Sequence, residues 1–301
     1  MSNTLFNEDF LRRLEHLQLV TRRPVAGHLR GAHRSRRTGS GMVFADYRPY
    51  TPGDDTRNLD WGIFLRLDRL ILRLFEEEAD LPVYIFVDTS ASMGFGKPSK
   101  FDFARKVGAA LAYLALLNYD RVSVIAYADG VAHELPARRG RTQVWPVFRF
   151  LEGLVPTGGT DLNAALRGWF GASRTRGLVL LLSDFLDRDG FAPAAQWLAQ
   201  FRHEVFAVQV HSPDEAEPDL PDHVQIADAE TGATHVIETT PALLAAYREA
   251  LVAHTEDIAT ICRRHGWAHL GARTDAPFED LMLKRSEERR VGKECSLPCR
   301  S

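Results

Sequence analysis

The sequence predicts an α/β fold: a three-layer, doubly wound and mostly parallel sheet, with an N-terminal helix and strand segment packed on it. Apolar runs rich in β-branched and aromatic residues predict strands that are buried on both faces. Amphipathic stretches between these runs predict helices. Strands that alternate with helices form parallel sheets, and right-handed crossovers bring the loops after the strands to one edge of the sheet.

The N-terminal elements are irregularly spaced. A helix at 7–19 is expected because Phe10, Leu14 and Leu17 recur at helical spacing behind Asn7, which can serve as its N-cap. The Gly- and Arg-rich stretch 21–41 is expected to be loop, and a short helix at 58–67 and a strand at 70–75 follow. Near the turn at 52–60 we expect Arg57 to pair with a carboxylate and Trp61 to pack into the core; a recognition surface is the alternative.

From residue 81 onwards, strands and helices alternate. Ser99 is expected to cap the helix that follows the first strand, since Asp102 stands three residues later. A turn at Asp129 and Gly130 predicts a short antiparallel partner for the second strand. The expected strands are 81–87, 121–127, 132–135, 178–182, 204–210, 224–226 and 235–237, and the expected helices are 100–117, 142–151, 161–170, 191–201 and 243–262.

Composition indicates an ordinary soluble protein. The chain has 301 residues, a formal net charge of −3, 45% hydrophobic and 26% charged residues. No apolar run reaches the length of a membrane span, and the first twenty residues lack the apolar core of a signal peptide. Cys262 is the only cysteine before the C-terminal tail, which fits a reducing compartment. We therefore expect a cytoplasmic protein.

The C-terminal tail is expected to be foreign to the protein. Residues 285–295, Arg-Ser-Glu-Glu-Arg-Arg-Val-Gly-Lys-Glu-Cys, resemble a sequencing adapter translated in frame. Cys295 and Cys299 in this tail are therefore not interpreted as metal ligands. We expect three parts: residues 1–78, residues 79–284, and a non-native tail at 285–301.

Oxygen-bearing side chains stand in three loops at the predicted edge of the sheet. Asp88, Ser90 and Ser92 follow the strand at 81–87, Thr160 follows two glycines, and Asp184 ends the strand at 178–182. Each one alone could be a helix or turn cap. Together they favour a hard cation, Mg²⁺ or Mn²⁺, with waters or a partner's oxygen filling the remaining positions. Neutral hydroxyl ligands leave the ion much of its charge, which suits the capture of a carboxylate better than hydrolysis.

The same residues carry a family resemblance. Asp-Thr-Ser-Ala-Ser-Met at 88–93, with Gly-Gly-Thr160 and Ser-Asp184, resembles the metal-ion-dependent adhesion site of von Willebrand factor type A (vWA) domains. Upstream, the stretches at 41–50, 52–57, 59–61 and 75–78 resemble the DUF58 family, in which such a domain follows an N-terminal segment. The resemblance implies a metal-dependent protein-binding module rather than an enzyme. It also implies a protein partner, a MoxR-type AAA+ ATPase or its client. Its metal ligands would be Asp88, Ser90, Ser92, Thr160 and Asp184.

Parts of the sequence are also compatible with two other functions, a hydrolase and a nucleic-acid binder. A magnesium-dependent hydrolase or phosphoesterase could use a strand-end aspartate, but Ser90 stands where the second aspartate of such enzymes is expected. A nucleic-acid binder could use the Arg-rich segment at 22–37, with salt-dependent affinity. No phosphate-binding loop of the Gly-x-x-x-x-Gly-Lys-Ser/Thr type is present.

Overall fold

A computed structural model describes residues 5–21, 38–52, 54–76, 82–171 and 175–279. The described residues group into two compact units. One lies within Met1–Arg22 and Pro82–Ser301, and the other lies within Arg23–Leu81. The sequence-based division instead placed the N-terminal helix with the small part and the boundary at residue 78. The Arg-rich stretch at 22–37 and the tail at 285–301 lie outside the described residues.

The large unit is built on a six-stranded sheet in the order β10-β7-β6-β3-β4-β5. The five strands from β10 to β4 run parallel, and β5 pairs antiparallel with β4 at the edge. The strands are β3 (Pro82–Asp88), β4 (Arg121–Tyr127), β5 (Val131–Arg139), β6 (Leu178–Ser183), β7 (Glu204–His211) and β10 (Ala268–Arg273). The prediction of a mostly parallel α/β sheet is therefore confirmed.

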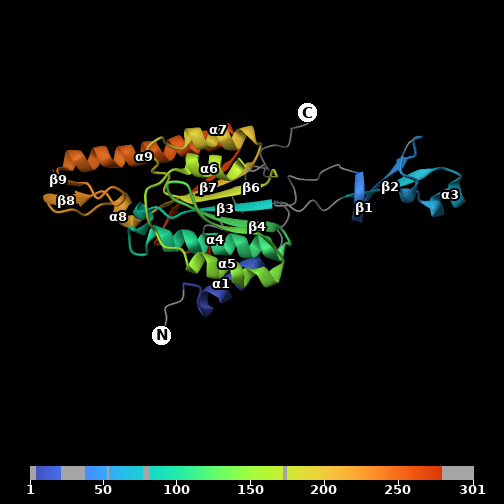
Figure 1. Cartoon of the computed structure of the whole chain (residues 1–301), viewed down its shortest axis with the longest axis horizontal. Helices are drawn as coiled ribbons and strands as arrows, with labels where there is room; N and C mark the ends of the chain where they lie inside the picture. Colours follow the sequence, from blue (N-terminus) through green and yellow to red (C-terminus); the bar gives the residue numbers. More distant parts are fainter. Residues whose placement is uncertain (1–4, 22–37, 53, 77–81, 172–174, 280–301) are drawn as a thin grey trace, which may run out of the picture. The chain divides into compact units, whose positions relative to one another are not determined.

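Helices cover both faces of this sheet (Figure 1). On one face lie α4 (Lys100–Leu117) and α5 (Val144–Glu152), and on the other lie α6 (Leu162–Phe170), α7 (Ala192–Gln200) and α9 (Pro241–Arg264). The central strands are buried on both sides, as their continuous apolar sequences require. Gly108 lets α4 approach closely, because a Cβ at this position would lie 3.0 Å from Leu182 Cδ1.

The N-terminal helix α1 (Glu8–Thr21) belongs to the large unit. Phe10 is buried and packs against Phe148 of α5 and Phe278, with ring centroids 6.1 and 5.1 Å apart. Phe6 stacks on the same Phe148 ring at 4.8 Å. These aromatic contacts hold α1 on the side of the sheet that α4 and α5 cover. A helix was predicted at 7–19, close to the bounds of α1.

Two small elements interrupt the chain between β7 and α9. The short helix α8 (Pro213–Ala216) begins with a complete capping box formed by Ser212 and Glu215. The hairpin of β8 (His223–Ala227) and β9 (Thr234–Glu238) follows, where two strands were predicted at 224–226 and 235–237; the two strands pair antiparallel. Strand β10 was not predicted, because Ala268–Arg273 lacks a continuous apolar run and lies at the sheet edge beside β7.

The small unit contains a two-stranded antiparallel sheet of β1 (Thr38–Pro49) and β2 (Ile71–Glu76), with α3 (Trp61–Leu67) between them. The start of β1 falls in the stretch expected to be loop. Asp60 caps α3 and pairs with Arg73 at 2.9 Å, while Asp54 pairs with Arg48 at 2.7 Å. Within the described residues no carboxylate pairs with Arg57, contrary to the prediction; Asp54 and Asp60 pair with arginines of the two strands instead. Trp61 is 58% exposed and is not a core residue.

Candidate metal centre

Asp88 ends the central strand β3 and is fully buried. Its Oδ2 accepts a hydrogen bond from Ser183 Oγ at 2.6 Å, at the end of the neighbouring strand β6. Tyr127, at the end of β4 on the other side, donates its hydroxyl to the same oxygen at 3.4 Å. Three adjacent parallel strands therefore deliver their last side chains to one carboxylate, as expected at the carboxyl edge of an open α/β sheet.

The first loop holds its two serines close together. Ser90 N donates to Asp88 Oδ1 at 2.9 Å, which turns the chain directly after the strand. The hydroxyls of Ser90 and Ser92 lie 3.1 Å apart across the 3-10 turn Ala91–Gly94. Ser90 makes no side-chain cap for this turn. The structure therefore does not support the alternative in which Ser90 serves as a cap.

The second loop is hydrogen-bonded to the first. Ala91 N donates to Gly158 O at 3.0 Å, and Thr157 N donates to Thr89 O at 2.7 Å. This pairing brings Thr160 Oγ1 to 3.4 Å from Asp88 Oδ2. The neighbouring Asp161 is the N-cap of α6, accepting from Ala164 N at 2.7 Å. Capping is thus done by Asp161, which leaves the hydroxyl of Thr160 facing Asp88.

The third loop adds a buried ion pair. Asp184 Oδ2 accepts from Lys100 Nζ at 2.7 Å, and Lys100 also pairs with Glu215 of the α8 turn. Lys100 and Asp184 are 1% and 3% exposed. Burial lowers the pKa of Lys100, but the two carboxylates raise it by more, so the ammonium is held in its charged form. No local pattern marks Lys100, and the Ser-x-x-Glu spacing of Ser212 and Glu215 indicates a helix cap, not a contact with this loop.

The electrostatics of the site are those of crowded, buried acids. Burial, and then the charge of Asp184, raise the pKa of Asp88 to about 7. Burial likewise raises the pKa of Asp187, in the same loop as Asp184, to about 6. Asp187 also accepts from Leu162 N at 3.2 Å and interacts with the side chain of Thr160. A cation placed among these oxygens would relieve the cost of keeping them ionised.

Three separate loops thus bring the five predicted residues together. Ser90 N and Thr160 Oγ1 donate to Asp88, the hydroxyl of Ser92 contacts that of Ser90, and the charge of Asp184 acts on Asp88. Their chemistry fits Mg²⁺ or Mn²⁺: the set contains two carboxylates, three hydroxyls, and no nitrogen or sulfur. Among the described residues, no three His, Cys, Asp or Glu side chains cluster as a metal site, so hydroxyls have to supply most of the coordination. Lys100 competes for one oxygen of Asp184, which weakens that carboxylate as a direct ligand. The site opens at Ser92 and Thr160, whose side chains are partly exposed.

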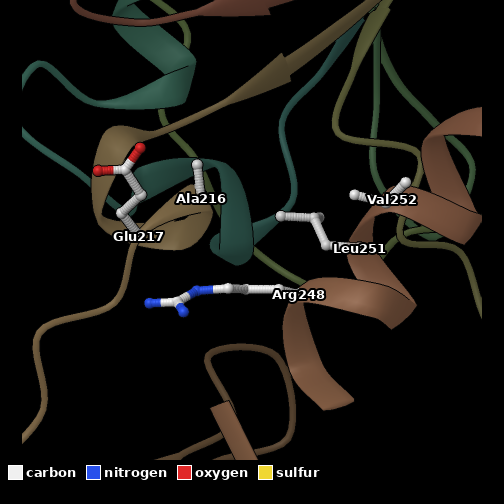
Figure 2. Close-up of a pocket in the computed structure, with 5 residues that line it drawn as sticks. All are labelled: Ala216, Glu217, Arg248, Leu251 and Val252. Atoms are coloured by element: carbon white, nitrogen blue, oxygen red, sulfur yellow. The ribbon is translucent and has the colours of Figure 1, made fainter. Parts of the chain in front are cut away.

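A separate pocket of about 520 Å³ lies between α8 and α9 (Figure 2). Its lining residues are Ala216, Glu217, Arg248, Leu251 and Val252. None of the predicted site residues is among them. Two apolar side chains of α9 with one acid and one base give no donor set for a cation, so the candidate centre remains at the sheet edge.

Comparison with known proteins decides the family. Residues 46–257 match the family model described as protein of unknown function DUF58. The chain belongs to the DUF58 family. An uncharacterized protein of Mycobacterium tuberculosis, Rv1480, is 30% identical to this DUF58 chain over 285 residues, covering 93% of this chain and 89% of the relative. The family predicted from the motifs is therefore confirmed.

Solved structures with partial similarity include two bacterial proteins. The conserved hypothetical protein BatB from Bacteroides thetaiotaomicron gives a TM-score of 0.45 at 17% identity, covering 71% of the DUF58 chain and 99% of BatB. The vWF domain of the type V pili tip protein Mfa5 from Porphyromonas gingivalis gives 0.34 at 13% identity, covering 70% and 95%. In the described part of the DUF58 chain, no helix has the length and apolar character needed to cross a membrane.

Proposed function

We propose that this DUF58 chain is a metal-dependent protein-binding module and not an enzyme. Asp88, Ser90, Ser92, Thr160 and Asp184 would hold a Mg²⁺ or Mn²⁺ ion, and the ion would offer an open position to a carboxylate of a partner protein. The partner we propose is a MoxR-type AAA+ ATPase or its client, with the chain acting as an adaptor or chaperone-like component. The proposed setting is the cytoplasm.

One observation carries the proposal: the hydroxyl of Thr160 and the end of β6 reach the buried carboxylate of Asp88 from parts of the chain 72 and 95 positions away. A cap or a turn would require only local contacts. Convergence of separate loops on one buried carboxylate is what a shared ligand requires.

Charge supports binding over catalysis. Among the described residues, Lys100 is the cation that pairs with the acids of the site, Asp184 and Glu215, so an added divalent cation meets a net negative environment. Hydrolysis would need a base positioned for a water molecule, and the carboxylate oxygens at the centre are already hydrogen-bonded to hydroxyls and a lysine. No observation favours the hydrolase or the nucleic-acid binder, and the Arg-rich segment of the latter lies outside the described residues.

Calorimetric titration with MnCl₂ tests the ion. We expect one Mn²⁺ to bind the wild-type chain and none to bind Asp88→Asn. Thr160→Val should weaken binding by about tenfold, equivalent to about 1.4 kcal/mol, while Thr160→Ser should retain it. Asp189→Asn is the matched control, because it removes one charge from an exposed position in the Asp184 loop. Wild-type affinity in folded Asp88→Asn would contradict the proposal.

The partner is tested separately. A purified MoxR-type ATPase from the same organism should bind the wild-type chain in MnCl₂, and the complex should dissociate in EDTA. A complex that survives EDTA, or that forms equally with Asp88→Asn, would show that the ion does not mediate the contact.

A further inference from the structure

The first half of α9 is apolar but is not buried. Residues 241–253 contain Arg248 and Glu249 as their only charged side chains. The buried residues of this helix, Ile258 and Cys262, both lie in its second half. In Figure 1 the first half of α9 extends past the six-stranded sheet. A helix of this composition is normally covered by other elements, so its exposed apolar surface indicates an interaction site.

One face of this half-helix forms a wall of the pocket between α8 and α9 (Figure 2). Leu251 and Val252 follow Arg248 by three and four positions, so the three side chains share one face of the helix. Ala216 and Glu217, at the end of α8, form the opposite wall. Val252 is 68% exposed, so the apolar part of the pocket opens to solvent. Its volume of about 520 Å³ lies in the range of ligand sites.

Hydrogen bonds hold the two walls of the pocket together. The hydroxyl of Tyr247, on α9, donates to the backbone oxygen of Glu215 at 2.9 Å. The helix α8 itself begins at the capping box of Ser212 and Glu215. The pocket is therefore formed by contacts within the chain, which lowers the cost of ordering that binding would otherwise require.

The pocket contains a positive charge that has no acidic partner among the described residues. Glu217 lies 3.8 Å from Arg273, which also pairs with Asp275. Arg248 forms no hydrogen bond or ion pair with a described residue. Figure 2 shows its side chain extended away from α9 toward the α8 side of the pocket. The guanidinium is therefore free to bind a carboxylate, the group that its planar set of donors matches best.

We propose that this pocket binds a segment of a partner protein in which an acidic side chain stands beside an apolar one. The apolar side chain would lie against Leu251 and Val252, and the carboxylate would pair with Arg248. A protein segment fits better than a small molecule, because the pocket is open and the same helix continues with the exposed side chains of Leu243 and Tyr247. The site goes beyond the proposed function, since it is separate from the candidate metal centre and needs no ion.

Selection from a random peptide library displayed on phage tests the site, with the full chain as the target and EDTA present throughout. EDTA removes divalent cations, so no bound ion offers a carboxylate another place to bind. We expect the enriched peptides to carry Asp or Glu close to Leu, Ile or Phe. With Arg248→Glu as the target, Lys or Arg should replace the acidic residue, because the charge of the pocket is reversed.

Fluorescence anisotropy with one enriched, labelled peptide then measures affinity. Val252→Glu should weaken binding by about tenfold or more, because it removes an apolar contact and places a carboxylate one turn from Arg248. Ala253→Glu is the matched control: it adds the same charge at the next position, which is also exposed, and should keep wild-type affinity. Thermal melts establish equal folding of the variants.

Two results would overturn this inference. One is a selection on the wild-type chain that enriches no peptides combining an acid with an apolar residue. The other is an enriched peptide that binds Arg248→Glu and Val252→Glu as tightly as it binds the wild-type chain. Either result leaves the metal-ion proposal standing, because every measurement is made without an ion.

Discussion

Lys100 Nζ lies 2.7 Å from Asp184 Oδ2, and the two side chains are 84 positions apart in the sequence. Both are buried, so neither charge can be screened by water. Glu215 adds a second carboxylate to the same ammonium and connects the site to the start of α8. The pair therefore links three elements: the N-terminus of α4, the loop after β6, and the α8 turn.

Replacing Lys100 by Met should destabilise the large unit. The substitution leaves Asp184 buried without its partner, which typically costs about 3–5 kcal/mol. Urea unfolding followed by circular dichroism measures the loss. Lys106→Met is the control, since Lys106 is a partly exposed residue of the same helix. Replacing both members of the buried pair, in Lys100→Met with Asp184→Leu, should recover part of the stability, since Glu215 still lacks its cation. Equal stability of Lys100→Met and Lys106→Met would show that the buried pair contributes nothing.

Two glycines should respond oppositely to alanine. Gly177 is buried before β6, and a Cβ there would lie 2.2 Å from the carbonyl oxygen of Pro82. Gly177→Ala should therefore cost about 1–3 kcal/mol, because backbone has to move. Gly168 lies in α6 with open space around its Cβ position, so Gly168→Ala should stabilise by about 0.5–1 kcal/mol. Denaturant midpoints of the two variants measure both effects, and a harmless Gly177→Ala would contradict the close approach of β3 and β6.

His203 should contribute a loss of stability in mildly acidic solution, opposite in sign to the contribution of Asp88 and Asp187, whose pKa values are raised. Burial lowers the pKa of His203 below its usual 6.5, and its Nδ1 accepts a hydrogen bond from Gly177 N at 3.2 Å. The unfolded chain then binds a proton at a higher pH than the folded chain. The stabilising contribution is complete above about pH 6.5 and is lost as the pH falls toward the lowered pKa.

Unfolding free energies between pH 5 and 8 test this expectation. His203→Asn, which can keep the acceptor for Gly177, should become more stable relative to wild type as the pH falls through this range, because the unfavourable contribution of His203 is removed. His223→Asn, at an exposed position on β8, should leave the pH dependence as in wild type. A wild-type pH profile in His203→Asn would exclude His203 as a source of the acid sensitivity.

Local sequence patterns were sufficient for most of the fold. The continuous apolar run of β3 indicates a strand buried on both faces, and the apolar stripe of α4 indicates a helix buried on one face. Both patterns extend over a few neighbouring residues, so they can be recognised without knowing which elements pack against them. Strands β10 and β1 were not predicted, and for β10 the reason is the opposite one. Ala268–Arg273 is only partly apolar, and its pairing with β7 depends on a neighbour about sixty positions earlier.

The sequence by itself determined the alternation of strands and helices and indicated five oxygen-bearing residues in the loops at one edge of the sheet, because short-range periodicity and residue chemistry specify both. Only the tertiary structure decided what surrounds those residues: Ser183 and Tyr127 on Asp88, and Lys100 on Asp184. These contacts join segments that are distant in the sequence, and a local sequence pattern does not specify which buried charged residues pair with each other.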